Sequence, residues 1–144
     1  MKQIKTDILI DASPEKVWSI LTDFENQSKW NPLIKSISGE RKVGATLKVF
    51  IQPPNGNGMT FKPLVLTFSE NKEFRWKGKL GISGIFDGEH YFQMTDLGNN
   101  QTKFIHGEKF SGILIPLMGK TLDKAKEGFE LMNQALKAEC EKVI

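Results

Sequence analysis

Two histidines and a glutamate in neighbouring stretches of the chain have the side chains needed for acid–base chemistry. His90 lies in the stretch Ile85–Asp96, and His106 and Glu108 lie in Thr102–Ser111. Imidazole gains and loses a proton near neutral pH, and an adjacent carboxylate can orient the ring or share that proton. The sequence contains no third histidine. These three residues are therefore the candidates around which a functional site would be built.

Both stretches alternate between apolar and polar residues, which predicts β-strands with one inward face. The inward faces carry Phe86, Gly88, His90, Phe92 and Met94 in the first stretch and Phe104, His106, Glu108 and Phe110 in the second. A hairpin centred near Asn99 would place His90 opposite Glu108 and Phe92 opposite His106. Because a buried ionisable group without a partner costs several kcal/mol, we expect the three to pair or to meet water in a cavity.

Four interpretations of this group are open. His90 and Glu108 can form a satisfied buried pair that only positions the hairpin. The three can instead line a wet pocket and contact a polar group of a ligand, or act as catalytic acid, base and orienting group. A metal site is the weakest interpretation, since two histidines and one carboxylate without fixed neighbours are a poor metal signal. We predict neither a metal nor a cofactor, and no Ser or Cys nucleophile adjoins the group.

The elements that would hold these residues begin with a long helix at the end of the chain. Apolar residues recur every three or four positions over 117–143, at Met118, Leu122, Ala125, Phe129, Met132, Leu136, Cys140 and Val143. This period predicts one amphipathic helix of about seven turns, roughly 40 Å long. A rod of that length needs a broad apolar surface to lie on.

The remaining elements supply that surface. The sequence predicts a first strand over Lys2–Asp11, a short helix capped by Ser13-Pro14, and a second helical turn through Phe24 to Trp30 that ends before Pro32. The further predicted strands are Ile34–Glu40, Thr46–Gln52, Thr60–Ser69, Glu73–Leu80, Ile85–Asp96 and Thr102–Ser111. The order predicts an α+β chain in which helices cover one face of a seven-stranded antiparallel sheet. We expect a single domain over residues 1–144.

Composition excludes several classes of protein. A net charge of +3 over 144 residues, with no basic run interleaved with aromatics, argues against nucleic-acid binding. One cysteine excludes an intrachain disulfide. No apolar run approaches the ~18 residues of a membrane span, and the first ten residues lack a signal-peptide core. We therefore expect a cytoplasmic protein without membrane insertion.

Several motifs resemble those of the SRPBCC (START-like, polyketide cyclase/dehydrase-related) superfamily. They are residues 10–18 (IDASPEKVW), 30–32 (WNP), 88–92 (GEHYF) and 106–112 (HGEKFSG). The resemblance runs over nearly the whole chain. It implies a helix-grip fold, in which a curved antiparallel sheet closes over a long C-terminal helix and leaves a cavity between them.

The resemblance also implies a function. Members bind or carry lipids, sterols, polyketides and other apolar molecules; a few are cyclases, aromatases or hydratases, and one branch acts by protein contact. Our leading expectation is a binder of an apolar or aromatic small molecule, with a cyclase- or hydratase-like enzyme or a protein-interaction module as alternatives. Transferred by element, the cavity would be lined by Trp30, Phe50, Phe61, Trp76, Phe86, His90, Phe92, His106, Glu108, Phe110, Leu122, Phe129 and Met132.

Overall fold

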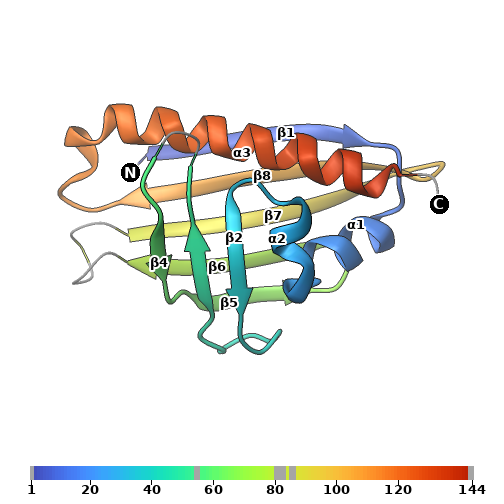
Figure 1. The fold of residues 1–144 in the computed structure, drawn as a ribbon, viewed down its shortest axis with the longest axis horizontal. Helices are drawn as coiled ribbons and strands as arrows, with labels where there is room; N and C mark the ends of the chain where they lie inside the picture. The colour runs from blue at the N-terminus through green and yellow to red at the C-terminus, as the bar shows by residue number, and fades with distance from the viewer. Residues whose placement is uncertain (1, 54–55, 80–83, 85–86, 143–144) are drawn as a thin grey trace.

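The computed structural model describes residues 2–53, 56–79, 84 and 87–142 (Figure 1). Within these residues eight strands form two sheets. The strands are β1 (Lys2–Ile10), β2 (Ile34–Ser38), β3 (Lys48–Ile51), β4 (Met59–Phe61), β5 (Leu64–Ser69), β6 (Glu73–Lys79), β7 (Asp87–Gly98) and β8 (Gln101–Ser111). The helices are α1 (Pro14–Leu21), α2 (Gln27–Trp30) and α3 (Gly119–Cys140), with short 3-10 turns at Phe24–Asn26 and Ile115–Leu117.

The larger sheet has the strand order β1-β8-β7-β6-β5, with every pair antiparallel. Its central hairpin turns at Gly98, Asn99 and Asn100, whose φ values of 80°, 54° and 56° lie in the left-handed region that Gly and Asn adopt most readily. The turn sets a register that pairs His90 with Glu108 and Phe92 with His106. The register predicted from the sequence is confirmed.

The smaller sheet, β2-β3-β4, runs across the larger one (Figure 1). The predicted strand Thr60–Ser69 is divided into β4 and β5 at Pro63, which has no N–H to donate to a ladder. Backbone hydrogen bonds from Leu47 N to Pro63 O (2.9 Å) and from Val65 N to Ala45 O (2.9 Å) connect the two sheets at this bend. This division accounts for eight described strands where the sequence predicts seven.

The first helix, α1, begins with the Ser-Pro cap that the sequence predicts. Ser13 caps it by accepting a hydrogen bond from Lys16 N (3.2 Å), and Pro14 occupies the first turn. It buries Val17, Trp18 and Leu21. The second helix ends at Trp30, and its C-cap Asn31 is extended (φ −86°, ψ 116°), as expected for a residue that precedes proline.

The long helix α3 lies along the larger sheet, near β1 and β8 (Figure 1). Its buried side chains include Leu122, Phe129, Met132, Leu136 and Cys140, which is the apolar face that the sequence predicts; Val143 lies outside the described residues. Its C-terminal end is tied to the end of β1, because Asp11 N donates to Glu141 Oε2 (2.8 Å) and Lys137 Nζ donates to Leu9 O (2.8 Å).

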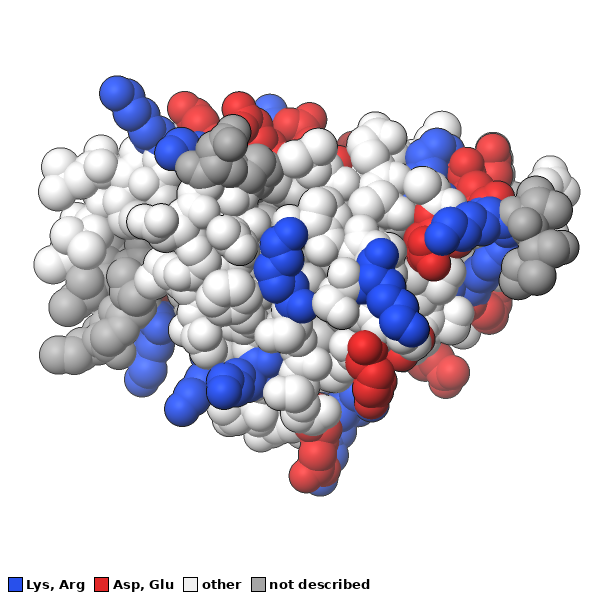
Figure 2. Space-filling view, in the orientation of Figure 1, with Lys and Arg blue, Asp and Glu red and all other residues white. Residues whose placement is uncertain are grey.

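The predicted α+β class, with a long C-terminal helix over antiparallel sheets, is therefore confirmed. Among the described residues, no helix is both long enough and apolar enough to cross a lipid bilayer. Figure 2 shows acidic and basic side chains scattered together over the face that carries α3 and the smaller sheet.

Candidate functional site

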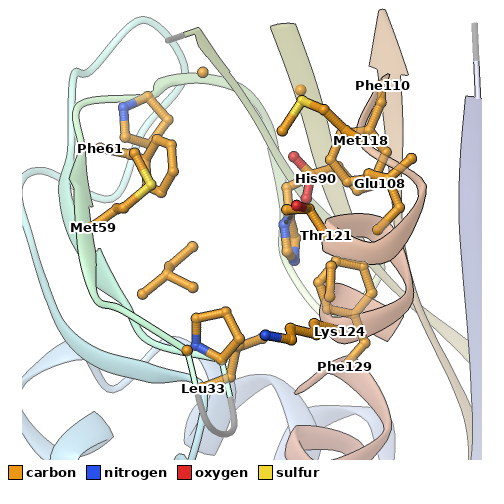
Figure 3. A pocket seen from close by; sticks show the side chains of 18 of the residues that line it. Leu33, Met59, Phe61, His90, Glu108, Phe110, Met118, Thr121, Lys124 and Phe129 are labelled. Carbon is orange, nitrogen blue, oxygen red and sulfur yellow. Dashed lines mark hydrogen bonds and ion pairs between the residues drawn. The ribbon is translucent and has the colours of Figure 1, made fainter. Parts of the chain in front are cut away.

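A pocket of about 400 Å³ lies between α3, the smaller sheet and one end of the larger sheet (Figure 3). Its walls are mostly apolar. The lining side chains and glycines are Leu33, Ile51, Pro53, Gly56, Asn57, Met59, Phe61, Pro63, Trp76, Gly78, Lys79, Gly88, His90, Glu108, Phe110, Met118, Thr121, Leu122, Lys124, Ala125 and Phe129.

Alternation along the strands sets two opposite walls of this pocket. Met59 and Phe61 project from the same face of β4, while Glu108 and Phe110 project from the same face of β8, since residues two apart share a face. Figure 3 shows these two pairs on opposite sides of the pocket, with Phe129 of α3 on the same side as Glu108 and Phe110. The smaller sheet therefore supplies one wall and the larger sheet the other.

The structure brings many of the residues predicted to line a cavity to this one place. They are Phe61, Trp76, His90, Glu108, Phe110, Leu122 and Phe129. They come from α3 and from four strands, β4, β6, β7 and β8. All of them face the space between the smaller sheet, the larger sheet and α3 at one end of the molecule.

Other predicted lining residues lie elsewhere and do not line the pocket. Phe92, His106 and Met132 are at most 1% exposed and belong to the interior between the sheet and α3. Trp30 is half-buried against the core. Phe50 lies on the other face of β3, beside Gly58, because the alternation that points Val49 and Ile51 inward points Phe50 outward. Phe86 lies outside the described residues.

Sequence reasoning missed lining residues on the smaller sheet and at the start of α3. They include Leu33, Ile51, Met59, Met118 and Ala125. Ile51 could have been found, since it shares the inward face of β3 with buried Val49. Met118 and Ala125 belong to the predicted apolar stripe of the helix, but only the position of the smaller sheet makes this part of the stripe a pocket wall.

One wall carries a chain of hydrogen bonds that runs from the pocket into the core. Glu108 Oε1 lies 3.1 Å from His90 Nδ1, and His90 Nε2 lies 2.7 Å from His106 Nε2. On the far side His106 Nδ1 lies 2.9 Å from Asn133 Oδ1 of α3. Asn133 Nδ2 donates to Thr6 Oγ1 (2.8 Å) on β1. Sequence reasoning identified the first three of these residues and missed Asn133 and Thr6.

The Thr6 hydroxyl closes this chain, since it donates to the backbone carbonyl of His106 (2.8 Å). The sequence could have identified Asn133 as a buried polar residue. It follows Met132, and it lies three positions before Leu136, so it shares the predicted buried face of the helix with both. A buried amide needs partners, and the two histidines are the polar groups that the sequence places under the helix.

Burial controls the protonation of the inner histidine. His106 is 0% exposed, and this burial, reinforced by the proximity of His90, holds the pKa of His106 well below its usual value, while the hydrogen bond to Asn133 opposes the shift. The imidazole of His106 is therefore neutral at pH 7.

The ring of Phe129 packs against both imidazoles. Its ring stacks on His106 with the centroids 4.3 Å apart and 17° between the planes, and it meets His90 edge-on at 5.0 Å. The ring of Trp76 also lies against His90, with the centroids 5.0 Å apart. The polar chain therefore reaches the pocket through His90 and Glu108, whose side chains are 2% and 18% exposed.

Two lysines and the cysteine are the other groups whose chemistry bears on the site. Lys79 and Lys124 line the pocket and give it positive charge near its edge. Burial raises the pKa of the Cys140 thiol to about 12, so it is not a nucleophile at neutral pH. Among the described residues no cluster of three or more His, Cys, Asp or Glu side chains could hold a metal ion.

Known structures share this fold closely. A START superfamily protein from Mycobacterium smegmatis matches with a TM-score of 0.78 and 24% identity, over 96% of this chain and 97% of that one. The Zhui aromatase/cyclase from Streptomyces sp. R1128 matches with a TM-score of 0.78 and 11% identity, over 97% and 93% of the two chains. A protein from Mesorhizobium loti matches at 0.76 and 18% identity, over 99% and 100%.

The sequence itself gives a second comparison. Among curated proteins, no sequence matches this chain. The family model described as polyketide cyclase / dehydrase and lipid transport matches residues 1–141, which is nearly the full length. The resemblance found in the sequence motifs and the similarity of the fold agree with this match. The chain belongs to the polyketide cyclase / dehydrase and lipid transport family.

Proposed function

We propose that the protein binds a small apolar or aromatic molecule in the pocket between α3 and the smaller sheet. The observation that carries this proposal is a cavity of about 400 Å³ with largely apolar walls and one hydrogen-bonded acid–base pair, Glu108 and His90. Small-molecule sites are typically cavities of about 300–1,000 Å³ lined by apolar side chains with a few polar groups that fix orientation.

The family supports a ligand of this kind, since its description joins polyketide chemistry with lipid transport. The structure adds a physical reason. Large apolar side chains on opposite walls, such as Phe61 and Phe110, favour the transfer of an apolar molecule from water at about 25 cal/mol for each Å² buried.

The proposal is tested by filling the pocket from the helix. Ala125 is half-buried on the pocket wall, whereas Ala138 is exposed on the same helix. Ala125→Trp should lower the affinity for the neutral probe 1-methoxynaphthalene at least tenfold in calorimetric titration, and Ala138→Trp should leave it unchanged. Native mass spectrometry of the protein as purified from cells should show a bound molecule that Ala125→Trp loses. A wild-type protein that binds neither a cellular molecule nor the probe would refute the proposal.

The position of Glu108 and His90 on the pocket wall favours a second candidate function, a cyclase- or hydratase-like enzyme. In that case Glu108 would accept a proton from the bound substrate and His90 would orient the carboxyl group. Glu108→Gln separates the two functions, because an amide keeps the size and hydrogen-bonding ability of the carboxyl group but not its basicity. Loss of turnover of a polyketide substrate with unchanged substrate affinity would establish catalysis, and unchanged turnover would exclude it.

A further inference from the structure

The carboxyl group of Glu108 presents one oxygen to its partner and the other to the pocket. Oε1 lies against His90 Nδ1. Oε2 lies over Gly88, at the position that a side chain at Gly88 would occupy, and Gly88 and Glu108 both line the pocket. No described residue donates a hydrogen bond to Oε2. A ligand in the pocket can therefore meet this oxygen.

The direction of the hydrogen bonds behind Glu108 is determined from the far end of the chain. The carbonyl oxygen of His106 can only accept, so the Thr6 hydroxyl must donate to it. That hydroxyl has one hydrogen, and toward Asn133 it can therefore only accept. The atom of Asn133 that faces Thr6 is thus the amide nitrogen, as the structure has it. The amide oxygen of Asn133 consequently faces His106.

The same logic extends through both imidazoles. His106 Nδ1 carries its proton, because it faces the oxygen of Asn133. Since the ring of His106 is neutral, its Nε2 has a lone pair and must accept from His90. His90 Nε2, which lies 2.7 Å away, therefore carries a proton. Two facing lone pairs at this distance would repel each other.

One proton remains to be placed between His90 Nδ1 and Glu108 Oε1, which are 3.1 Å apart. If it lies on the nitrogen, His90 is an imidazolium and Glu108 is a carboxylate. If it lies on the oxygen, His90 is neutral and Glu108 is an acid whose hydrogen points at His90. In both arrangements Oε2 carries no hydrogen and the pair has no net charge. The pocket therefore meets a hydrogen-bond acceptor.

We infer that the ligand of this pocket carries a hydrogen-bond donor, a hydroxyl or N–H group on its apolar skeleton, which donates to Glu108 Oε2. The inference rests on the proposed binding function and narrows it to a class of ligand. A molecule of the same skeleton that can only accept, such as a methyl ether, places its oxygen lone pairs against those of Oε2. The series of hydrogen bonds from Thr6 to Glu108 thus sets which ligands the pocket accepts, and it also holds three elements of the fold together.

The test compares 1-naphthol with 1-methoxynaphthalene, which differ in their ability to donate. We expect the wild-type protein to bind 1-naphthol about five- to tenfold more tightly at pH 7, the effect of one hydrogen bond. Glu108→Met removes the acceptor and should abolish the preference. Glu108→Gln should retain it, because the amide nitrogen takes the position facing His90 Nδ1 and directs the amide oxygen into the pocket. The quantity compared between proteins is the ratio of the affinities for 1-naphthol and 1-methoxynaphthalene. The extra methyl group of the ether enters this ratio in every protein, so a change in the ratio reports the hydrogen bond.

Different results of this experiment would refute the binding function and the requirement for a hydrogen-bond donor. A wild-type protein that binds neither naphthalene compound refutes the binding function. Equal affinity for the two compounds, a preference that survives in Glu108→Met, or a preference lost in Glu108→Gln overturns the inference alone. Nitrogen NMR of the wild-type imidazoles tests it without any variant. We expect His106 protonated at Nδ1 and unprotonated at Nε2, and the opposite tautomer would overturn the inference.

Discussion

Gly88 leaves space for the Glu108 carboxyl group in its position beside His90. A Cβ built there would overlap Glu108 Oε2, whereas a Cβ at Gly78, its partner across β6 and β7, would meet only Pro63 Cβ at 3.8 Å. Neither glycine has the positive φ that would itself demand glycine. The requirement for glycine at 88 is therefore one of space for the carboxyl group.

This difference gives a matched pair of variants. Gly88→Ala should displace the Glu108 carboxyl group from His90 and lower the free energy of unfolding by roughly 1–3 kcal/mol, the cost of leaving a buried polar group without its partner. Gly78→Ala should change it by less than about 0.5 kcal/mol, as most uncrowded substitutions do. Urea unfolding measures both, and equal effects of the two variants would contradict the role assigned to Gly88.

The neutral imidazole of His106 makes stability depend on pH. Its pKa in the folded protein is well below the usual value, so the folded state keeps it neutral while the unfolded chain binds a proton below pH about 6.5. The stabilising contribution is therefore present above that pH and is lost as pH falls toward the folded pKa. Its titratable neighbours in the hydrogen-bonded chain are His90 and Glu108.

We expect the free energy of unfolding to decline between pH 7 and 5.5 with a slope that includes up to about 1.4 kcal/mol per pH unit from this proton. His106→Gln should flatten the slope, whatever its effect on stability at pH 7. Denaturant unfolding at a series of pH values measures the slope. An identical slope in the variant would mean that His106 is protonated in the folded state.

At the scale of the element, α3 has two functions along its length. Leu122 and Phe129 line the pocket, Asn133 holds the inner end of the polar chain, and Leu136 and Cys140 are fully buried against the closed end. Met132, which the sequence assigns to the cavity, is 0% exposed and belongs to the packed part. The pocket therefore ends near Phe129, whose ring stacks on the buried imidazole of His106.

Two leucines of α3 provide the corresponding prediction. Leu136 is 0% exposed and Leu131 is 47% exposed. Leu136→Ala should lower the free energy of unfolding by about 2–5 kcal/mol, because it leaves a cavity in a packed interior. Leu131→Ala should cost less than about 0.5 kcal/mol. Chemical unfolding measures both. A small effect at Leu136 would show that the C-terminal part of α3 is loosely packed against the sheet.

At the scale of the whole molecule, the two sheets differ in how firmly they are held. β7 and β8 are long and are paired on both sides, whereas β4 has three residues, Met59–Phe61, and among the described strands pairs with β3 alone. Short strands at an edge open locally at lower free energy than central strands. The wall of the pocket opposite Glu108 is thus the less stable one.

Hydrogen exchange tests this asymmetry. The amides of Met59–Phe61 should exchange faster than those of the central part of β8, and saturation with 1-naphthol should slow them, since Met59 and Phe61 line the pocket. Amides of Thr95 and Lys103, which pair with each other near the turn of the β7–β8 hairpin and do not line the pocket, serve as a control that the ligand should not affect. Exchange at β4 as slow as at β8 would show that both walls open only when the protein unfolds.

The sequence by itself determined the order of elements, the fold class and the register of the β7–β8 hairpin. These follow from local rules: a period of two or of 3.6, a Ser-Pro cap, and Gly and Asn at a turn. The register then placed His90 opposite Glu108. The family motifs agree with the same result, because they lie in these locally determined elements.

Only the tertiary structure decided where the pocket lies and which side of each aromatic faces it. Phe50 and Ile51 are neighbours in sequence, but the way the smaller sheet crosses the larger one puts Ile51 at the pocket and Phe50 outside it. Thr6 and Asn133 are separated by 127 positions, and no local pattern connects them to His106. Their hydrogen bonds orient the ring of His106 and place its proton on Nδ1, because the directions of donors and acceptors are set only when three distant elements meet.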